Sequence, residues 1–90
     1  MQYKIYTMPH CEKCENIKHF LKEHKISVQE IDLGDDEGVA ELRKIYIQIK
    51  DKVTRTSDGQ LPIPLFISFK DSLVDKVGNS LDDVKTIVQG

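Results

Sequence analysis

Cys11 and Cys14 are the residues of this sequence whose type and spacing most directly indicate chemistry. They are the only two cysteines of the chain, and side chains three positions apart on a helix lie on one face, close enough for their sulfurs to bond. Small secreted domains held by disulfides normally use four or more cysteines, and a bridge this short adds little stability. The pair therefore predicts thiol–disulfide chemistry rather than a structural crosslink.

The position of each cysteine predicts its role. Pro9 ends a short strand and helical spacing begins at Cys11, so Cys11 lies where the first amides of a helix lack intrahelical partners. Such amides and the helix dipole favour an anion and lower the pKa of a cysteine thiol, so the Cys11 thiolate is the expected nucleophile. Cys14 aligns with the apolar Ile17 and Leu21, so we expect it to be more buried and to resolve the mixed disulfide.

Charged neighbours can tune this thiolate. Lys13 would stabilise it and Glu12 would oppose it, while a protonated His10 would add positive charge. His10 and Lys13 are therefore candidate tuners of the Cys11 pKa, although a lone surface histidine is more often a bystander.

A metal site is the main alternative from another function class, because a CxxC pair can be half of one. The sequence has no second CxxC, and His10, His19 and His24 are the other strong ligand candidates. These residues share one short segment with the cysteines, so four ligands from one chain would not converge tetrahedrally. A metal-binding or metal-transfer module stays open as the alternative to redox catalysis.

A proline precedes the apolar run Leu65-Phe66-Ile67. Proline is unusual at the start of an interior strand, because it cannot donate a ladder hydrogen bond. If the Ile63–Pro64 bond is cis, the backbone groups of Ile63 would face solvent and could pair with an extended thiol substrate. A trans proline at a strand start is the commoner arrangement and remains the alternative.

The elements that position these residues alternate along the chain. We expect strands over residues 2–7, 26–33, 61–69 and 73–77, and helices over residues 11–24, 36–50 and 81–88, the last capped by Ser80. The first strand–helix–strand unit should be parallel, and the tight turn between the last two strands makes them antiparallel. We therefore predict a single α/β domain over residues 1–90, in which three helices flank a four-stranded mixed sheet.

Composition narrows the function classes. Thirteen basic and 15 acidic residues give a net charge of −2, which offers no support for nucleic-acid binding. No apolar run approaches the ~20 residues of a membrane span, and the N-terminus is too polar for a signal peptide. We expect a cytoplasmic monomer that binds neither nucleic acid nor membranes.

Three segments together resemble the glutaredoxin family of the thioredoxin superfamily. Residues 6–14 resemble its strand–loop–CxxC, residues 59–64 resemble the segment leading into its cis-proline, and residues 78–82 resemble the turn before its last helix. The resemblance implies a thioredoxin/glutaredoxin-like fold and a disulfide reductase of electron transport and cell redox homeostasis. Pro64 is the matching proline.

The resemblance also implies substrate contacts and partners. With Ile63, the candidate contacts for substrate or glutathione are Gln60, Pro64, Asn79, Ser80 and Asp82. No bound cofactor is implied, and glutathione can serve as a co-substrate. The implied partners are proteins with disulfides, including ribonucleotide reductase, and a reductant that is glutathione or a flavoprotein of the thioredoxin-reductase type. Met8 stands where the family usually has a lysine that contacts glutathione, so the choice of reductant stays open.

Overall fold

A computed structural model describes residues 2–52 and 63–89 of the chain. Its elements follow the predicted order β-α-β-α-β-β-α. They are β1 (Gln2–Thr7), α1 (Glu12–Glu23), β2 (Gln29–Asp32), α2 (Asp36–Ile49), β3 (Leu65–Lys70), β4 (Leu73–Gly78) and α3 (Leu81–Gln89). Across both described ranges, every helix is too short or too polar to cross a lipid bilayer.

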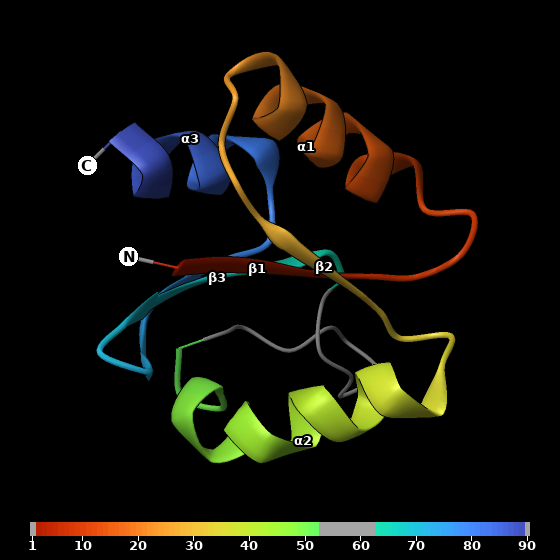
Figure 1. Cartoon of the computed structure of the whole chain (residues 1–90), viewed down its shortest axis with the longest axis vertical. Coiled ribbons are helices and arrows are strands. Elements are labelled where there is room, and N and C mark those ends of the chain that lie inside the picture. The colour runs from red at the N-terminus through yellow and green to blue at the C-terminus, as the bar shows by residue number, and fades with distance from the viewer. Residues whose placement is uncertain (1, 53–62, 90) are drawn as a thin grey trace.

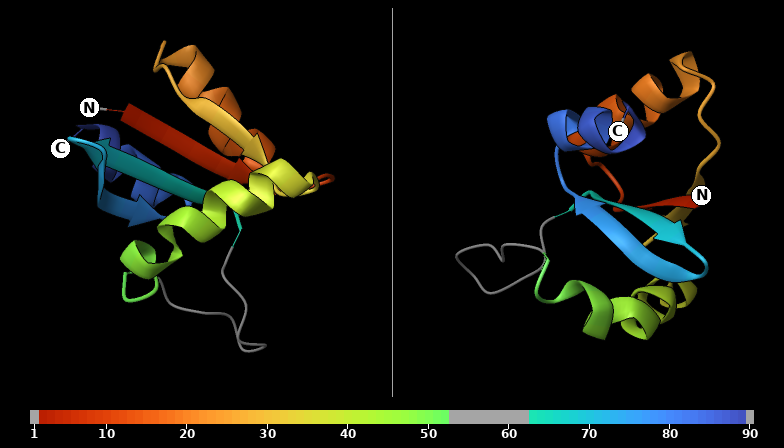
Figure 2. Two further views of the ribbon diagram at one scale, coloured as in Figure 1. Left: turned by 60° about the horizontal axis from the view of Figure 1, so that its bottom comes forward. Right: turned by 90° about the vertical axis from the view of Figure 1, so that its left-hand side faces the viewer.

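The four strands of the described residues form one mixed sheet in the order β2-β1-β3-β4. β1 pairs in parallel with β2 and antiparallel with β3, and β3 pairs antiparallel with β4. Helices α1 and α3 cover one face of the sheet and α2 covers the other (Figure 1), and the turned views in Figure 2 show the same three layers. The predicted α/β fold, a mixed sheet flanked by helices, is confirmed.

The sheet separates two apolar clusters, because successive side chains of a strand point to opposite faces. On β1, Ile5 packs beneath α1 and α3, while Tyr6 packs against α2. The buried members on the α1/α3 side are Ile5, Ile17, Leu21, Phe66, Val84 and Ile87. Those on the α2 side are Tyr6, Ile31, Ile49, Leu65, Ile67 and Phe69. Each such side chain stabilises the fold by about 1.5–3 kcal/mol.

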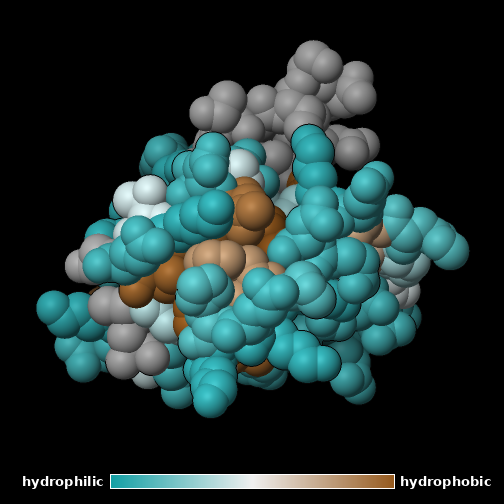
Figure 3. Space-filling view, turned by 90° about the horizontal axis from the view of Figure 1, so that it is seen from above, coloured by the Kyte–Doolittle hydropathy of each residue, from teal (hydrophilic) through white to brown (hydrophobic). Residues whose placement is uncertain are grey.

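The outer surface over α1 and α3 is mostly hydrophilic, with apolar atoms near its centre (Figure 3). Partly buried hydrophobic residues that pack against the first cluster belong to β1, to these two helices and to the chain that follows α1. Phe20 is one of them, and the His24 ring lies against it with 4.3 Å between ring centroids.

The strand register gathers several loops at one end of the sheet. The register pairs at this end are Tyr6–Leu65, Thr7–Asp32 and Phe66–Gly78. The carboxyl ends of β1, β2 and β4 and the amino end of β3 therefore lie together. We call this the site end and define it as residues 8–13, 33–37, 63–64 and 79–83. All three helices begin there, as the loops that enter α1 and α2 show in Figure 1.

Several predicted element boundaries were wrong. The strand expected over residues 26–33 covers Gln29–Asp32, because the Ile26 amide bonds to the Leu21 carbonyl at 2.9 Å and stays with the end of α1. The strand expected over residues 61–69 begins at Leu65 and extends through Lys70; residues 61 and 62 lie outside the described residues. Helix α1 begins one residue later than expected, with Cys11 as its extended N-cap.

Candidate active site

The loop between β1 and α1 is held at the site end by contacts with the loop that follows β2. The Leu33 amide donates to the Thr7 carbonyl at 2.7 Å. A Cβ added to Gly34 would lie 3.1 Å from Cγ of Pro9, so glycine allows the two loops to approach closely. His10 then turns the chain with a φ of 60°, a left-handed conformation in which histidine is enriched among non-glycine residues.

Cys11 is the N-cap of α1, with φ −100° and ψ 104°. Its sulfur accepts a hydrogen bond from the Cys14 amide at 3.1 Å, and its carbonyl accepts one from the Glu15 amide at 3.2 Å. A serine or aspartate oxygen usually fills this position. Here a sulfur takes that place, so any negative charge on Cys11 faces a backbone amide at the positive end of the helix dipole.

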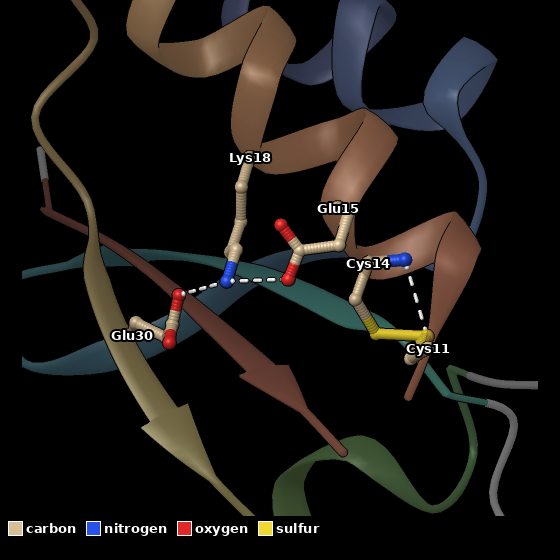
Figure 4. A network of polar contacts seen from close by, with 5 residues as sticks. All are labelled: Cys11, Cys14, Glu15, Lys18 and Glu30. Atoms are coloured by element: carbon tan, nitrogen blue, oxygen red, sulfur yellow. Dashed lines mark hydrogen bonds and ion pairs between the residues drawn. A yellow bond between two sulfur atoms is a disulfide. The ribbon is translucent and has the colours of Figure 1, made fainter. Parts of the chain in front are cut away.

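Cys11 and Cys14 form a disulfide in this structure, with their Cα atoms 5.2 Å apart (Figure 4). Cys14 is only 1 % exposed, whereas Cys11 is partly exposed. The greater burial that the sequence predicts for Cys14 is confirmed. The geometry therefore presents one sulfur to a partner and keeps the other one turn behind it.

An ion-pair network beside the disulfide links α1 to β2 (Figure 4). Lys18 Nζ lies 3.0 Å from Glu15 Oε1 and 2.9 Å from Glu30 Oε2. The hydrogen bond to Glu30, followed by that to Glu15, raises the pKa of Lys18 above its ordinary value. Because two carboxylates hold this ammonium, it adds no net positive charge near the sulfurs.

The predicted tuners of Cys11 lie on either side of it. His10 is exposed in the loop before Cys11, and Lys13 is exposed in the first turn of α1. The structure brings both to the site end, together with Glu12.

The predicted substrate-contact residues that the structure describes also belong to the site end. Pro64 is fully buried, Ile63 is partly exposed, and the peptide bond between them is cis. Because Leu65 pairs with Tyr6, these two residues lie beside the strand end that leads to Cys11. Gln60 falls outside the described residues.

The start of α3 is capped by its own side chains. Ser80 Oγ accepts a hydrogen bond from the Asp83 amide at 3.1 Å, which confirms Ser80 as the N-cap. Asp83 Oδ2 in turn accepts one from the Asn79 amide at 3.1 Å. Asp82 was the predicted contact at this helix start, and the capping role of Asp83 was not predicted. The spacing Ser-x-x-Asp, a variant of the reciprocal capping box, was the signal for it.

Among residues 2–52 and 63–89, no three histidine, cysteine, aspartate or glutamate side chains are grouped as a metal site would require.

Comparison with known proteins agrees with this geometry. The family model described as Glutaredoxin matches residues 4–64, more than half of the chain. Crystal structures of the thioredoxin-like protein BC3987 and of a mutant of it are 22% and 21% identical to the chain, with TM-scores of 0.59 and 0.61. These matches cover 96% and 97% of this chain and 99% of each of those chains.

Glutaredoxin 1 from Francisella tularensis, crystallised with cacodylate, is 19% identical with a TM-score of 0.58; the match covers 98% of this chain and 92% of that one. No curated protein sequence is significantly similar to the chain. The solved structures share the fold, and the family model covers the CxxC and the strand–helix units around it. The chain belongs to the glutaredoxin family.

Proposed function

We propose that this thiol–disulfide redox protein is a dithiol electron carrier that reduces disulfides with Cys11 as nucleophile and Cys14 as resolving thiol. The observation that supports the proposal is the asymmetry of the pair. Cys11 is partly exposed and its sulfur accepts an amide hydrogen bond at a helix start, whereas Cys14, to which it is bonded, is buried. Helix N-termini lower the pKa of cysteine thiols and thereby supply the reactive thiolate.

The reaction then proceeds through two exchanges. The Cys11 thiolate attacks one sulfur of the substrate disulfide, forms a mixed disulfide and displaces the other substrate sulfur as a thiolate, which takes up a proton. The Cys14 thiol loses its proton and attacks Cys11 Sγ, which releases the second substrate thiol. Two electrons and two protons pass to the substrate, and the protein is left with the Cys11–Cys14 disulfide that this structure contains.

The other residues of the site end form the proposed docking surface for the substrate chain. Ile63 and Pro64 lie beside the strand end that leads to Cys11, and Asn79, Ser80 and Asp82 lie at the start of α3. We expect Ile63 to contact an extended substrate through its backbone and the α3 turn to contact it at its flank. His10 and Lys13 would modulate the Cys11 thiolate from either side.

The oxidised protein needs a reductant, which is either glutathione or a flavoprotein of the thioredoxin-reductase type. Two observations favour the flavoprotein. Met8, the uncharged residue at the position where a lysine would bind a glutathione carboxylate, is 49% exposed. The backbone amide of Asn79, which could bind another carboxylate of glutathione, already donates a hydrogen bond to the carboxylate of Asp83. Ribonucleotide reductase in the cytoplasm is one disulfide-containing partner that such a carrier would serve.

Paired cysteine variants test the proposal. With a protein disulfide as substrate, Cys14→Ser should accumulate a mixed disulfide on Cys11, and Cys11→Ser should form none. Exposed Asn16→Ala, one turn along the same helix, should retain turnover and serves as the control. Full turnover by Cys11→Ser would refute the assignment. Recycling the wild type with each reductant in turn identifies the one that it uses.

A further inference from the structure

The charged side chains of the site end are mostly of one sign. Its segments contain a single lysine, Lys13, and six carboxylates. The six are Glu12, Asp35, Asp36, Glu37, Asp82 and Asp83, and all are exposed. Because the whole chain has 13 basic and 15 acidic residues, this end is far more acidic than the rest of the molecule.

The fold explains why these charges accumulate around the disulfide. Each helix has acidic residues in its first turn, where a carboxylate stabilises the positive end of the helix dipole. In an isolated helix, this stabilisation concerns only the end of that helix. Here all three helices begin at the same end of the sheet, so their acidic first turns together form one surface around Cys11.

Among the described residues, no ion pair includes a carboxylate of this surface, although Lys52 lines a pocket together with one of them, Asp83. The ion pairs of the described residues connect lysines and a histidine to Glu15, Glu23, Glu30 and Glu41, all outside the site end. The Asp83 carboxylate binds the Asn79 amide, so the chain's own anion fills a position where an anionic ligand could bind. In the sequence, residues 53–62 contain one arginine and one aspartate, which cancel in net charge.

We infer that this redox site selects its substrates by charge and takes disulfides flanked by cationic groups, such as a protein disulfide with neighbouring lysines or arginines. The inference rests on the proposed function of Cys11 and Cys14. Opposite charges speed the encounter of two molecules and like charges slow it, and salt screens both effects. A negatively charged disulfide, such as that of glutathione, is correspondingly disfavoured.

Three small disulfides of similar size test this selection: bis(2-aminoethyl) disulfide, which is cationic, bis(2-hydroxyethyl) disulfide, which is neutral, and dithiodipropionate, which is anionic. For each disulfide, the single-turnover rate constant for its reduction by the reduced protein is divided by the rate constant for its reduction by dithiothreitol. This normalisation removes differences in intrinsic reactivity among the three disulfides. At about 0.01 M ionic strength, the normalised rate should be at least about threefold higher for the cationic disulfide than for the neutral one. It should be lowest for the anionic disulfide, and the three should converge near 1 M salt.

Two double variants with equal change in net charge separate local from global effects. Asp36→Asn/Glu37→Gln removes two charges at the site end and should lower the cationic preference at least about twofold. Asp51→Asn/Asp71→Asn removes two exposed charges outside the site end, one after α2 and one in the β3–β4 turn, and should preserve the preference.

Equal normalised rates for the three disulfides, or equal effects of the two double variants, would overturn the charge selection. Reduction of the neutral disulfide tests the proposed function alone, because charge selection does not affect it. If the protein reduces none of the three, the dithiol mechanism fails and the charge selection falls with it. If it reduces the neutral disulfide without charge preference, only the charge selection fails.

Discussion

Gly38 lies at the start of α2, where the helix crosses the end of β2, and the structure has no room there for a methyl group. A Cβ on Gly38 would overlap the carbonyl oxygen of Asp32 and lie 2.7 Å from its carbonyl carbon. It would also lie 3.2 Å from Cγ2 of Ile31. Because backbone atoms cannot rotate away as a side chain can, Gly38→Ala must push α2 away from the sheet.

Two opposing effects decide the sign of this substitution. Alanine is more favourable than glycine in a helix by about 0.8–1.0 kcal/mol. Overpacking a buried contact costs about 1–3 kcal/mol, and a backbone obstacle places Gly38→Ala at the upper end of that range. We expect a net loss of about 1–2 kcal/mol in the free energy of unfolding. For a domain of this size, the loss corresponds to a fall in Tm of about 4–16 °C.

Thermal unfolding followed by circular dichroism measures this effect, with Ala40→Gly as the matched control. Ala40 is exposed in the same helix, so its replacement should cost about 1 kcal/mol through helix propensity alone. Both variants should therefore unfold at lower temperature than the wild type. If helix propensity governed both sites, the two shifts would have opposite signs. A Tm of Gly38→Ala equal to or above that of the wild type would refute the packing argument.

Three further predictions concern the cap, the core and the nucleophile. Ser80→Ala removes the acceptor of the Asp83 amide and should destabilise the protein by about 0.5–2 kcal/mol in urea unfolding, whereas Ser80→Asp should preserve most of the stability. Burial, and to a lesser degree the charge of Glu41, raises the pKa of Tyr6 from 10.0 to about 12, so the native state keeps this proton when the unfolded chain has lost it. Stability should then fall by roughly 1–3 kcal/mol between pH 10 and 12 through this group, and Tyr6→Phe should lack that part of the fall in urea titrations at each pH. In reduced Cys14→Ser, the Cys11 thiol should titrate below the ordinary pKa of ~8.5 in thiolate absorbance, and a midpoint at or above that value would contradict the helix-start argument.

Local signals in the sequence were sufficient to predict the order of elements and the capping positions. The apolar spacing around Ile17 and Leu21 placed Cys14 on the inner face of a helix, and the structure confirms its burial. Ser80 was predicted as an N-cap from its residue type and the apolar pattern after it, and its hydroxyl does accept the expected bond. These predictions succeeded because each depends on residues within one or two helical turns.

Features that depend on distant segments could not be read from local patterns. The close approach of Gly34 to Pro9 depends on the parallel pairing of β1 with β2, which brings their ends together. The acidic surface at the site end arises because three helices begin at one place, since the most acidic stretch, residues 35–37, supplies only three of its six carboxylates.

The most direct test of the central claim is to measure which cysteine of the reduced protein reacts first. A limiting amount of iodoacetamide, added at neutral pH and followed by proteolysis and mass spectrometry, reports the alkylated fraction of each residue. Because Cys11 is the partly exposed N-cap residue and Cys14 is 1% exposed, Cys11 should be modified at least about tenfold faster. Equal labelling, or faster labelling of Cys14, would contradict the account.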